Sequence, residues 1–159
     1  MSSGKDHDKA IQVWVIPYSL VIGLVSGIQC GVLAAFAFSI GGYWFSPDLD
    51  TKSIVLKRWG ILKFLWWPYR KLIRHRSIFS HSPIIGTSVR LLYLFGIAYL
   101  AIYLLQPLGV PSPLNTAKIL QVKLIQYPKE SLSIIISLEA SAWLHLLKDG
   151  DPFPMKSLR

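Results

Sequence analysis

Three apolar stretches, separated by charged segments, dominate the hydrophobicity pattern of this chain. Positions 13–45 hold no charged residue at all, a run of 33 positions. Residues 84–105 carry a single charged side chain, Arg90, and residues 131–147 a single acidic one, Glu139. A membrane-spanning helix needs about 20 apolar residues, so the first stretch is too long for one span and each of the others suits one.

This pattern predicts an all-α fold, a membrane-embedded bundle of about four helices with a loop at the cytoplasmic face. The first stretch is predicted to be a hairpin that turns near Gly27 to Gly31, and the last helix should end near Gly150. A short helix over 114–125 is expected on the outer surface. The single membrane domain then consists of hairpin 13–46, cytoplasmic loop 47–82, helix 83–106, external loop 107–128, helix 129–148 and tail 149–159.

Prolines mark the expected ends of these helices. The second helix should end at Ser46, because the residue before a proline, here Pro47, is disfavoured in helical geometry. Ser82 and Pro83 suit the N-cap and the first position of the third helix. Pro128 suits the start of the fourth helix for the same reason.

Composition and charge support a membrane protein. The chain is 52% hydrophobic, and its mean hydropathy of +0.44 is high for a soluble domain of 159 residues. Of the 17 lysines and arginines, eight lie in the central loop and only Lys118, Lys123 and Lys129 lie between the third and fourth helices. By the positive-inside rule, both termini and the central loop are cytoplasmic, and the protein is a multi-pass protein of the cell (inner) membrane.

The central loop alternates cations with aromatic residues over positions 57–76. Tryptophan and tyrosine favour the headgroup layer, and basic side chains there are attracted to anionic lipids. An amphipathic segment on the cytoplasmic surface, with membrane lipids as partners, is therefore expected. Nucleic acid could use the same residue types but is disfavoured, because the loop is tied to the bilayer at both ends.

The chain's four histidines all lie at the edges of the apolar stretches, on the side that this topology makes cytoplasmic. His145 and Asp149 are four residues apart, so on a helix they share one face with Cβ atoms roughly 5 to 6 Å apart. Asp48 and Asp50 are two apart in a predicted turn, where alternate side chains can point the same way. The predicted metal ligands are His7, Asp48, Asp50, His75, His81, His145 and Asp149.

Imidazole mixed with carboxylate suits zinc, manganese or iron, and seven ligands exceed the four of one tetrahedral zinc. One or two divalent ions are therefore expected, with a metal-activated water attacking a phosphorus or carbonyl centre. Arg76 is the predicted catalytic residue that holds an anionic oxygen. A non-catalytic alternative is a membrane scaffold or sensor in which the metal clamps N-terminus, loop and tail together.

Arg90 and Glu139 lie within apolar helices, where an unpaired charge is costly. At about 1.5 Å per residue, both lie roughly 9 to 14 Å below the level of the histidines. They are expected to pair with each other and to join the third helix to the fourth.

The order of these motifs resembles a known family. The strings SGKDHD, SPDLD, KRWG and WWPYRKLIRHRSIFSHSPIIGT, followed by His145 and Asp149, are similar to a bacterial family of uncharacterised metal-binding multi-pass membrane proteins. More distantly, the pattern resembles the membrane-bound metal-dependent hydrolases, inner-membrane proteins of the SOS-regulated type. That resemblance implies the same seven ligands and a hydrolase. For a metal centre at the level of the cytoplasmic headgroups, a lipid phosphate or another phosphoester would be the natural substrate. This chain has Ser77 and Ser80 where the hydrolases usually have glycine and threonine.

Overall fold

The computed structural model describes residues 4–150, whose regular structure is helical throughout, with no strand among them, which confirms the all-α prediction. Within these residues, four segments are long and apolar enough to cross a membrane. With η marking 3₁₀ helices, the elements are α1 (Gly4–Ser26), α2 (Ile28–Tyr43), η1 (Pro47–Asp50), α3 (Ile54–Arg58), η2 (Gly60–Leu65), α4 (Trp66–Leu72), α5 (Ile78–His81), α6 (Ile85–Leu105), η3 (Gln106–Leu108), α7 (Pro113–Gln126) and α8 (Pro128–Asp149).

The predicted hairpin is formed by α1 and α2. Gly27 joins them with a φ of 101°, a backbone angle that residues with a Cβ rarely adopt. A Cβ on Gly31 would lie 2.8 Å from Gly23 Cα and 2.9 Å from the Ser19 carbonyl oxygen, so the helices pack backbone against backbone near the turn. Because α1 begins well before position 13, His7 lies on the first helix and not ahead of it.

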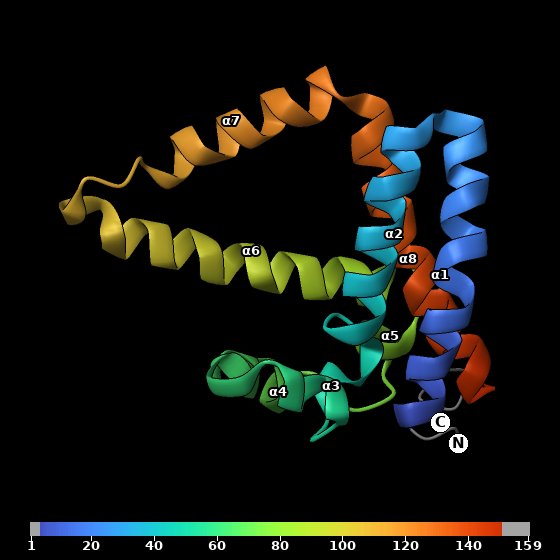
Figure 1. The fold of residues 1–159 in the computed structure, drawn as a ribbon. Helices are drawn as coiled ribbons and strands as arrows, with labels where there is room; N and C mark the ends of the chain where they lie inside the picture. The colour runs from blue at the N-terminus through green and yellow to red at the C-terminus, as the bar shows by residue number, and fades with distance from the viewer. Residues whose placement is uncertain (1–3, 151–159) are drawn as a thin grey trace.

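The third helix of a compact bundle is α8, which packs along α2 (Figure 1). Small side chains permit this approach. Ser133, Ser137 and Ser141 of α8 are buried, and a Cβ on Gly41 of α2 would collide with the Ser141 hydroxyl. As predicted, α8 begins with Pro128 and ends before Gly150, which adopts a φ of 70°.

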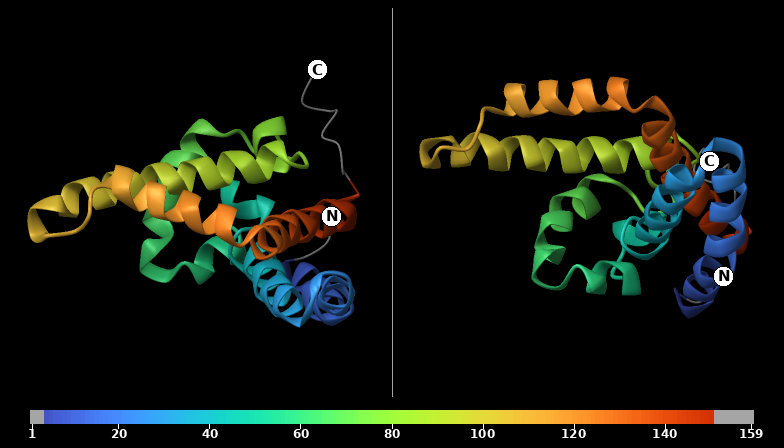
Figure 2. Two further views of the ribbon diagram at one scale, coloured as in Figure 1. Left: turned by 90° about the horizontal axis from the view of Figure 1, so that it is seen from above. Right: turned by 45° about the horizontal axis from the view of Figure 1, so that its top comes forward.

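The fourth apolar helix, α6, departs from the predicted arrangement. Four crossings of one bilayer call for four roughly parallel helices, but α6 lies crosswise to α1, α2 and α8 and extends away from them, and α7 leads back to the bundle (Figures 1 and 2). The chain turns sharply at Ile84, whose φ is 62°. The short helix expected over 114–125 is present as α7.

The start of the third predicted helix was placed too early. α6 begins at Ile85 and not at Ser82–Pro83. The reason is that Ser82 ends the preceding helix, α5, where its hydroxyl donates a hydrogen bond to the carbonyl oxygen of Ile78. Pro83 therefore lies in the connection between two helices.

The predicted Arg90–Glu139 ion pair is not formed. Arg90 donates hydrogen bonds to the Ser80 carbonyl oxygen at 2.8 Å and to Thr87 Oγ1 at 3.1 Å. Glu139 Oε1 instead accepts from the backbone N–H of Ile84 at 2.7 Å. The transverse course of α6 explains the change, because it turns the arginine towards α5 and the carboxylate towards the bend.

The central region consists of short helices that form a small core. Trp66 and Tyr69 of α4 are fully buried, and the Trp66 ring packs edge-to-face on Phe45 with centroids 6.0 Å apart. Leu49, Val55 and Leu56 complete this cluster. Burial of these two aromatic residues holds η1, and with it two candidate ligands, against α4.

Candidate metal centre

Four distant parts of the chain meet at the end of the bundle where α1 begins and α8 ends. α1 supplies His7, η1 supplies the two aspartates, α5 supplies His81, and α8 supplies His145 and Asp149. The remaining candidate ligand, His75, lies in the connection between α4 and α5.

Asp48 lies at the middle of this group. Its Oδ1 atom is 3.8 Å from His81 Nε2 and 3.5 Å from His145 Nε2. One helical turn further along α8, Asp149 Oδ2 is 3.3 Å from His145 Nε2. One ligand atom from each of these four residues lies within 4.8 Å of all the others, which fits a single ion between them.

His7 joins the same group through Asp149. Its Nε2 atom lies 3.2 Å from Asp149 Oδ1, and its ring stacks on that of His145 with centroids 3.8 Å apart and an interplanar angle of 19°. The N-terminal part of α1 thus packs directly on the C-terminal turn of α8.

The chemistry of these donors fits a divalent cation. His81 Nε2 and His145 Nε2 are buried and form no hydrogen bond with any part of residues 4–150, although burying such an atom without a partner is costly. His81 Nε2 lies 3.8 Å from Asp48 Oδ1, and His145 Nε2 lies 3.5 Å from the same oxygen and 3.3 Å from Asp149 Oδ2. Ligands about 2.0 to 2.1 Å from a tetrahedral zinc lie roughly 3.3 Å from one another, close to this spacing.

The other two predicted ligands, Asp50 and His75, lie on the opposite edge of the His81 ring. Asp50 Oδ2 is 3.2 Å from His81 Nδ1, and Asp50 Oδ1 is 3.0 Å from His75 Nδ1. The seven residues therefore divide into two groups that share His81, and they do not surround one point. The sequence could not separate them, because the ring has two nitrogens on different sides.

Two serines that sequence reasoning missed hold the histidine rings. Ser46 Oγ forms a hydrogen bond with His145 Nδ1 at 3.1 Å, and Ser80 Oγ forms one with His81 Nδ1 at 3.0 Å. Both bonds occupy Nδ1 and leave Nε2 facing Asp48. Such partners fix the tautomer and orientation of a metal-binding histidine. A serine beside a proline or a histidine gives no sequence signal for this role.

A solvent-accessible cavity of about 270 Å³ opens onto the candidate centre. Its walls include His7, Asp48 and His145 together with the exposed Lys52 and Lys57. These two lysines were not predicted as site residues. They bring two positive charges to the wall of the cavity, where Asp8 also lies, paired with Arg58.

Arg76, the predicted anion-binding residue, lies elsewhere. It is half-buried with a φ of 58°, and it makes no hydrogen bond or ion pair with any of residues 4–150. It does not line the cavity beside the metal centre. Its place directly after His75 in the sequence suggested the role, but the backbone turns between the two histidines.

Metal affinity is expected to depend on pH through His81. Burial disfavours the charged ring, but the nearby carboxylates of Asp48 and Asp50 outweigh burial and raise the pKa of His81 to about 9. A metal ion must displace that proton, so affinity should rise about tenfold per pH unit up to about pH 9 and level off above it. Chelator competition across this range, with proton release recorded on binding, checks the slope. Affinity independent of pH would show that His81 is not a ligand.

Asp50 and His75 are expected to affect the metal less than the four central residues do. An Asp50→Asn variant should keep one ion per chain with an affinity reduced roughly 10- to 100-fold, as for other residues that orient a ligand. His75 has a side chain that is 42% exposed, and His75→Ala should leave the stoichiometry unchanged. Elemental analysis measures the number of ions per chain, and chelator competition measures the metal affinity. A fall from two ions to one would instead place a second ion at Asp50, His75 and His81.

The fold and this donor set define a helical protein with membrane-length apolar helices and a candidate metal centre at one end. Residues 2–158 match the family described as "Uncharacterized metal-binding protein (DUF2227)", and the chain belongs to that family.

One curated relative shares part of the chain. A protein of Aquifex aeolicus (strain VF5), described as an uncharacterized protein, is 47% identical over 58 residues, which make up 36% of this chain and 40% of the relative. The chain thus matches less than half of that relative's length. No solved structure matches it significantly.

Proposed function

We propose that this protein is a metal-dependent hydrolase that acts on a phosphoester at the cytoplasmic face of the membrane. The observation that carries the proposal is the cavity, because it reaches His7, Asp48 and His145 and is also lined by Lys52 and Lys57. A metal that only stabilises a fold has a closed shell of ligands, whereas a catalytic metal keeps one side open. The resemblance of the motif order to membrane-bound metal-dependent hydrolases points the same way.

The residues of the centre have two roles. Asp48, His81, His145 and Asp149 hold the ion, with His7 supporting Asp149. Ser46, Ser80 and Asp50 orient the two central rings. When bound, a divalent ion supplies a water of lowered pKa and polarises a phosphoryl oxygen.

Lys52 and Lys57 take the anion-binding role that the sequence suggested for Arg76. Both line the cavity, so their ammonium groups attract a phosphate towards the centre. The same cavity accommodates a small headgroup or ester and not a large polymer.

The membrane orientation follows from charge. The metal centre, the first turn of α1 and the last turn of α8 lie at one end of the bundle (Figure 1). The basic central region lies at that end too, so the positive-inside rule places it in the cytoplasm. Exposed Phe64 and Trp67, with Lys71 Nζ 4.8 Å from the Trp67 ring, support contact of this region with anionic headgroups.

A non-catalytic metal clamp is the second candidate. It is favoured by the fact that the centre joins α1, η1, α5 and α8, which are far apart in the sequence. In this case the metal contributes to stability and nothing is turned over.

A phosphoesterase screen with the metal-loaded protein in detergent distinguishes a hydrolase from a non-catalytic metal clamp. The Lys52→Ala/Lys57→Ala double variant should hydrolyse the best substrate with KM raised about 5- to 50-fold. A hydrogen bond to a charged group contributes about 1.5 to 3 kcal/mol, and solvent screening reduces this contribution at exposed lysines. Its metal content should equal that of the wild type. Lys118→Ala on α7 is the matched control. Metal loading that raises the melting temperature with no turnover of any phosphoester would favour the clamp.

A further inference from the structure

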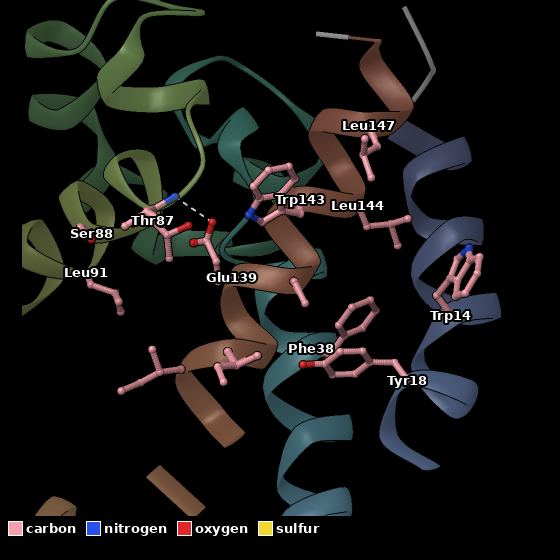
Figure 3. A pocket seen from close by; sticks show the side chains of 14 residues that line it. Trp14, Tyr18, Phe38, Thr87, Ser88, Leu91, Glu139, Trp143, Leu144 and Leu147 are labelled. Atoms are coloured by element: carbon pink, nitrogen blue, oxygen red, sulfur yellow. Dashed lines mark hydrogen bonds between the residues drawn. The ribbon is translucent and has the colours of Figure 1, made fainter. Parts of the chain in front are cut away.

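A long apolar groove of about 650 Å³ lies beside the bundle, away from the candidate metal centre (Figure 3). Trp14 and Tyr18 of α1 form one wall, Trp143 and Leu144 of α8 form the floor, and Leu91 of α6 lies on the far side. No residue of the metal centre lines it.

Three polar side chains of the groove, Tyr18, Thr87 and Glu139, already have partners within the protein. The Tyr18 hydroxyl and Ser137 Oγ are 3.1 Å apart and share a hydrogen bond. Glu139 points towards α6, where it accepts from the Ile84 N–H, and Thr87 accepts from Arg90. What the groove offers a ligand is therefore mainly apolar surface, which suits a hydrocarbon chain.

The dimensions of the groove match one leaflet of a bilayer. Along α8 its lining runs from Ile135 to Leu147, a rise of about 18 Å at 1.5 Å per residue. Half of the hydrocarbon core of a bilayer is about 15 Å thick. A single acyl chain inserted from one surface would therefore reach the far end of the groove.

A second hollow, of about 420 Å³, adjoins the groove at its end nearest the metal centre. The two hollows share Trp14, and the second is lined by Lys9 and Lys148 with Asp6. Its cations outnumber its carboxylate, so it favours an anion. Tryptophan at the border between an apolar and a charged surface is typical of the membrane interface.

We propose that the two hollows together bind one anionic phospholipid of the cytoplasmic leaflet. Its phosphate lies between Lys9 and Lys148, and one acyl chain passes Trp14 and fills the groove along α8. The site is separate from the metal centre, and it stands whether or not that centre is catalytic. A bound lipid would fix the spacing of α1 and α8, the two helices that carry His7, His145 and Asp149.

Tryptophan quenching by brominated lipids tests the site. The full-length, metal-loaded protein is placed in nanodiscs of phosphatidylcholine that contain an equal fraction of either brominated phosphatidylglycerol or brominated phosphatidylcholine. The difference in fluorescence between wild type and Trp14→Phe isolates Trp14. Half-maximal quenching of Trp14 should need several-fold less brominated phosphatidylglycerol than brominated phosphatidylcholine, since each lysine contributes about a fivefold preference for the anionic lipid.

Two variants and a control make the result specific. Lys9→Ala/Lys148→Ala should remove the preference for the anionic lipid, and Ala140→Leu, which narrows the groove, should reduce quenching by both lipids. Lys118→Ala/Lys129→Ala removes the same charge far from the site and should change neither. Unchanged metal content shows that each variant is folded.

Three results would overturn the proposal. They are equal quenching of Trp14 by both lipids in the wild type, a preference for the anionic lipid that survives the loss of both lysines, and loss of that preference when glycerol phosphate alone is added. Protection of Trp14 from both lipids, together with a dimer in sedimentation, would show that a second copy of the chain covers the groove instead.

Discussion

The His81→Ala variant is expected to purify without stoichiometric metal. His81 is 4% exposed, its Nε2 atom faces Asp48, and its Nδ1 atom faces Asp50 and Ser80, so its removal takes one ligand from the centre and one imidazole partner from each carboxylate. Loss of one ligand of four should weaken binding by more than the roughly 10- to 100-fold expected for an orienting residue. Asp48→Ala should behave in the same way, because Asp48 contacts both central histidines.

Elemental analysis of the purified proteins, side by side with the wild type, gives the answer directly. His75→Ala is the matched control, since it removes an imidazole that lies outside the central group. Wild-type metal content in both the His81 and Asp48 variants would show that the centre described here does not bind the ion. If neither the variants nor the wild type holds metal after loading with zinc, manganese and iron in turn, the proposed metal centre is wrong.

The Arg90→Ala variant is expected to lose about 2 to 5 kcal/mol of stability, the range for truncating a large buried side chain. Arg90 is 1% exposed, and its guanidinium holds the Ser80 carbonyl oxygen and Thr87 while it lies 5.7 Å above the Phe45 ring. Truncation leaves the Ser80 carbonyl oxygen without this donor and opens a cavity beneath α5. Because Ser80 precedes His81, metal affinity should fall too.

Thermal unfolding in detergent, followed by tryptophan fluorescence, measures the loss, and chelator competition measures the affinity. Arg90→Lys keeps the charge but cannot make both hydrogen bonds, so it should fall between wild type and alanine. Arg74→Ala removes an exposed arginine from the same region and should have little effect. A wild-type melting temperature for Arg90→Ala would mean that its buried hydrogen bonds do not hold α5.

The conformational preferences of single residues were sufficient to predict several helix ends, although α2 ends at Tyr43 and not at the predicted Ser46. The turn at Gly27 and the start of α8 at Pro128 follow from the conformations that glycine and proline allow. The start of α6 could not be predicted in this way, because Ser82 and Pro83 suit a helix start equally well in many settings. In this structure the Ser82 hydroxyl donates a hydrogen bond to the Ile78 carbonyl oxygen of α5 and does not cap α6.

In the candidate centre, too, some features follow from spacing along the chain and others depend on tertiary packing. The spacing of His145 and Asp149 places both on one face of a helix, and the apolar stretches bring His7 and Asp48 to the same end of the bundle. Spacing along one helix cannot say which edge of an imidazole faces which carboxylate. That choice separates Asp50 from Asp48, and it depends on the relative rotation of α5 and η1.

By itself, the sequence determined the helical class, the four apolar segments, the hairpin and the collection of histidines and aspartates at one end, because these depend on the hydrophobicity and conformational preferences of neighbouring residues. Only the tertiary structure decided the transverse course of α6, the separate partners of Arg90 and Glu139, and the presence of Lys52 and Lys57 beside the centre in place of Arg76. These features depend on how elements far apart in the chain rotate and pack, and the buried contacts that fix those rotations leave no periodic pattern in the sequence.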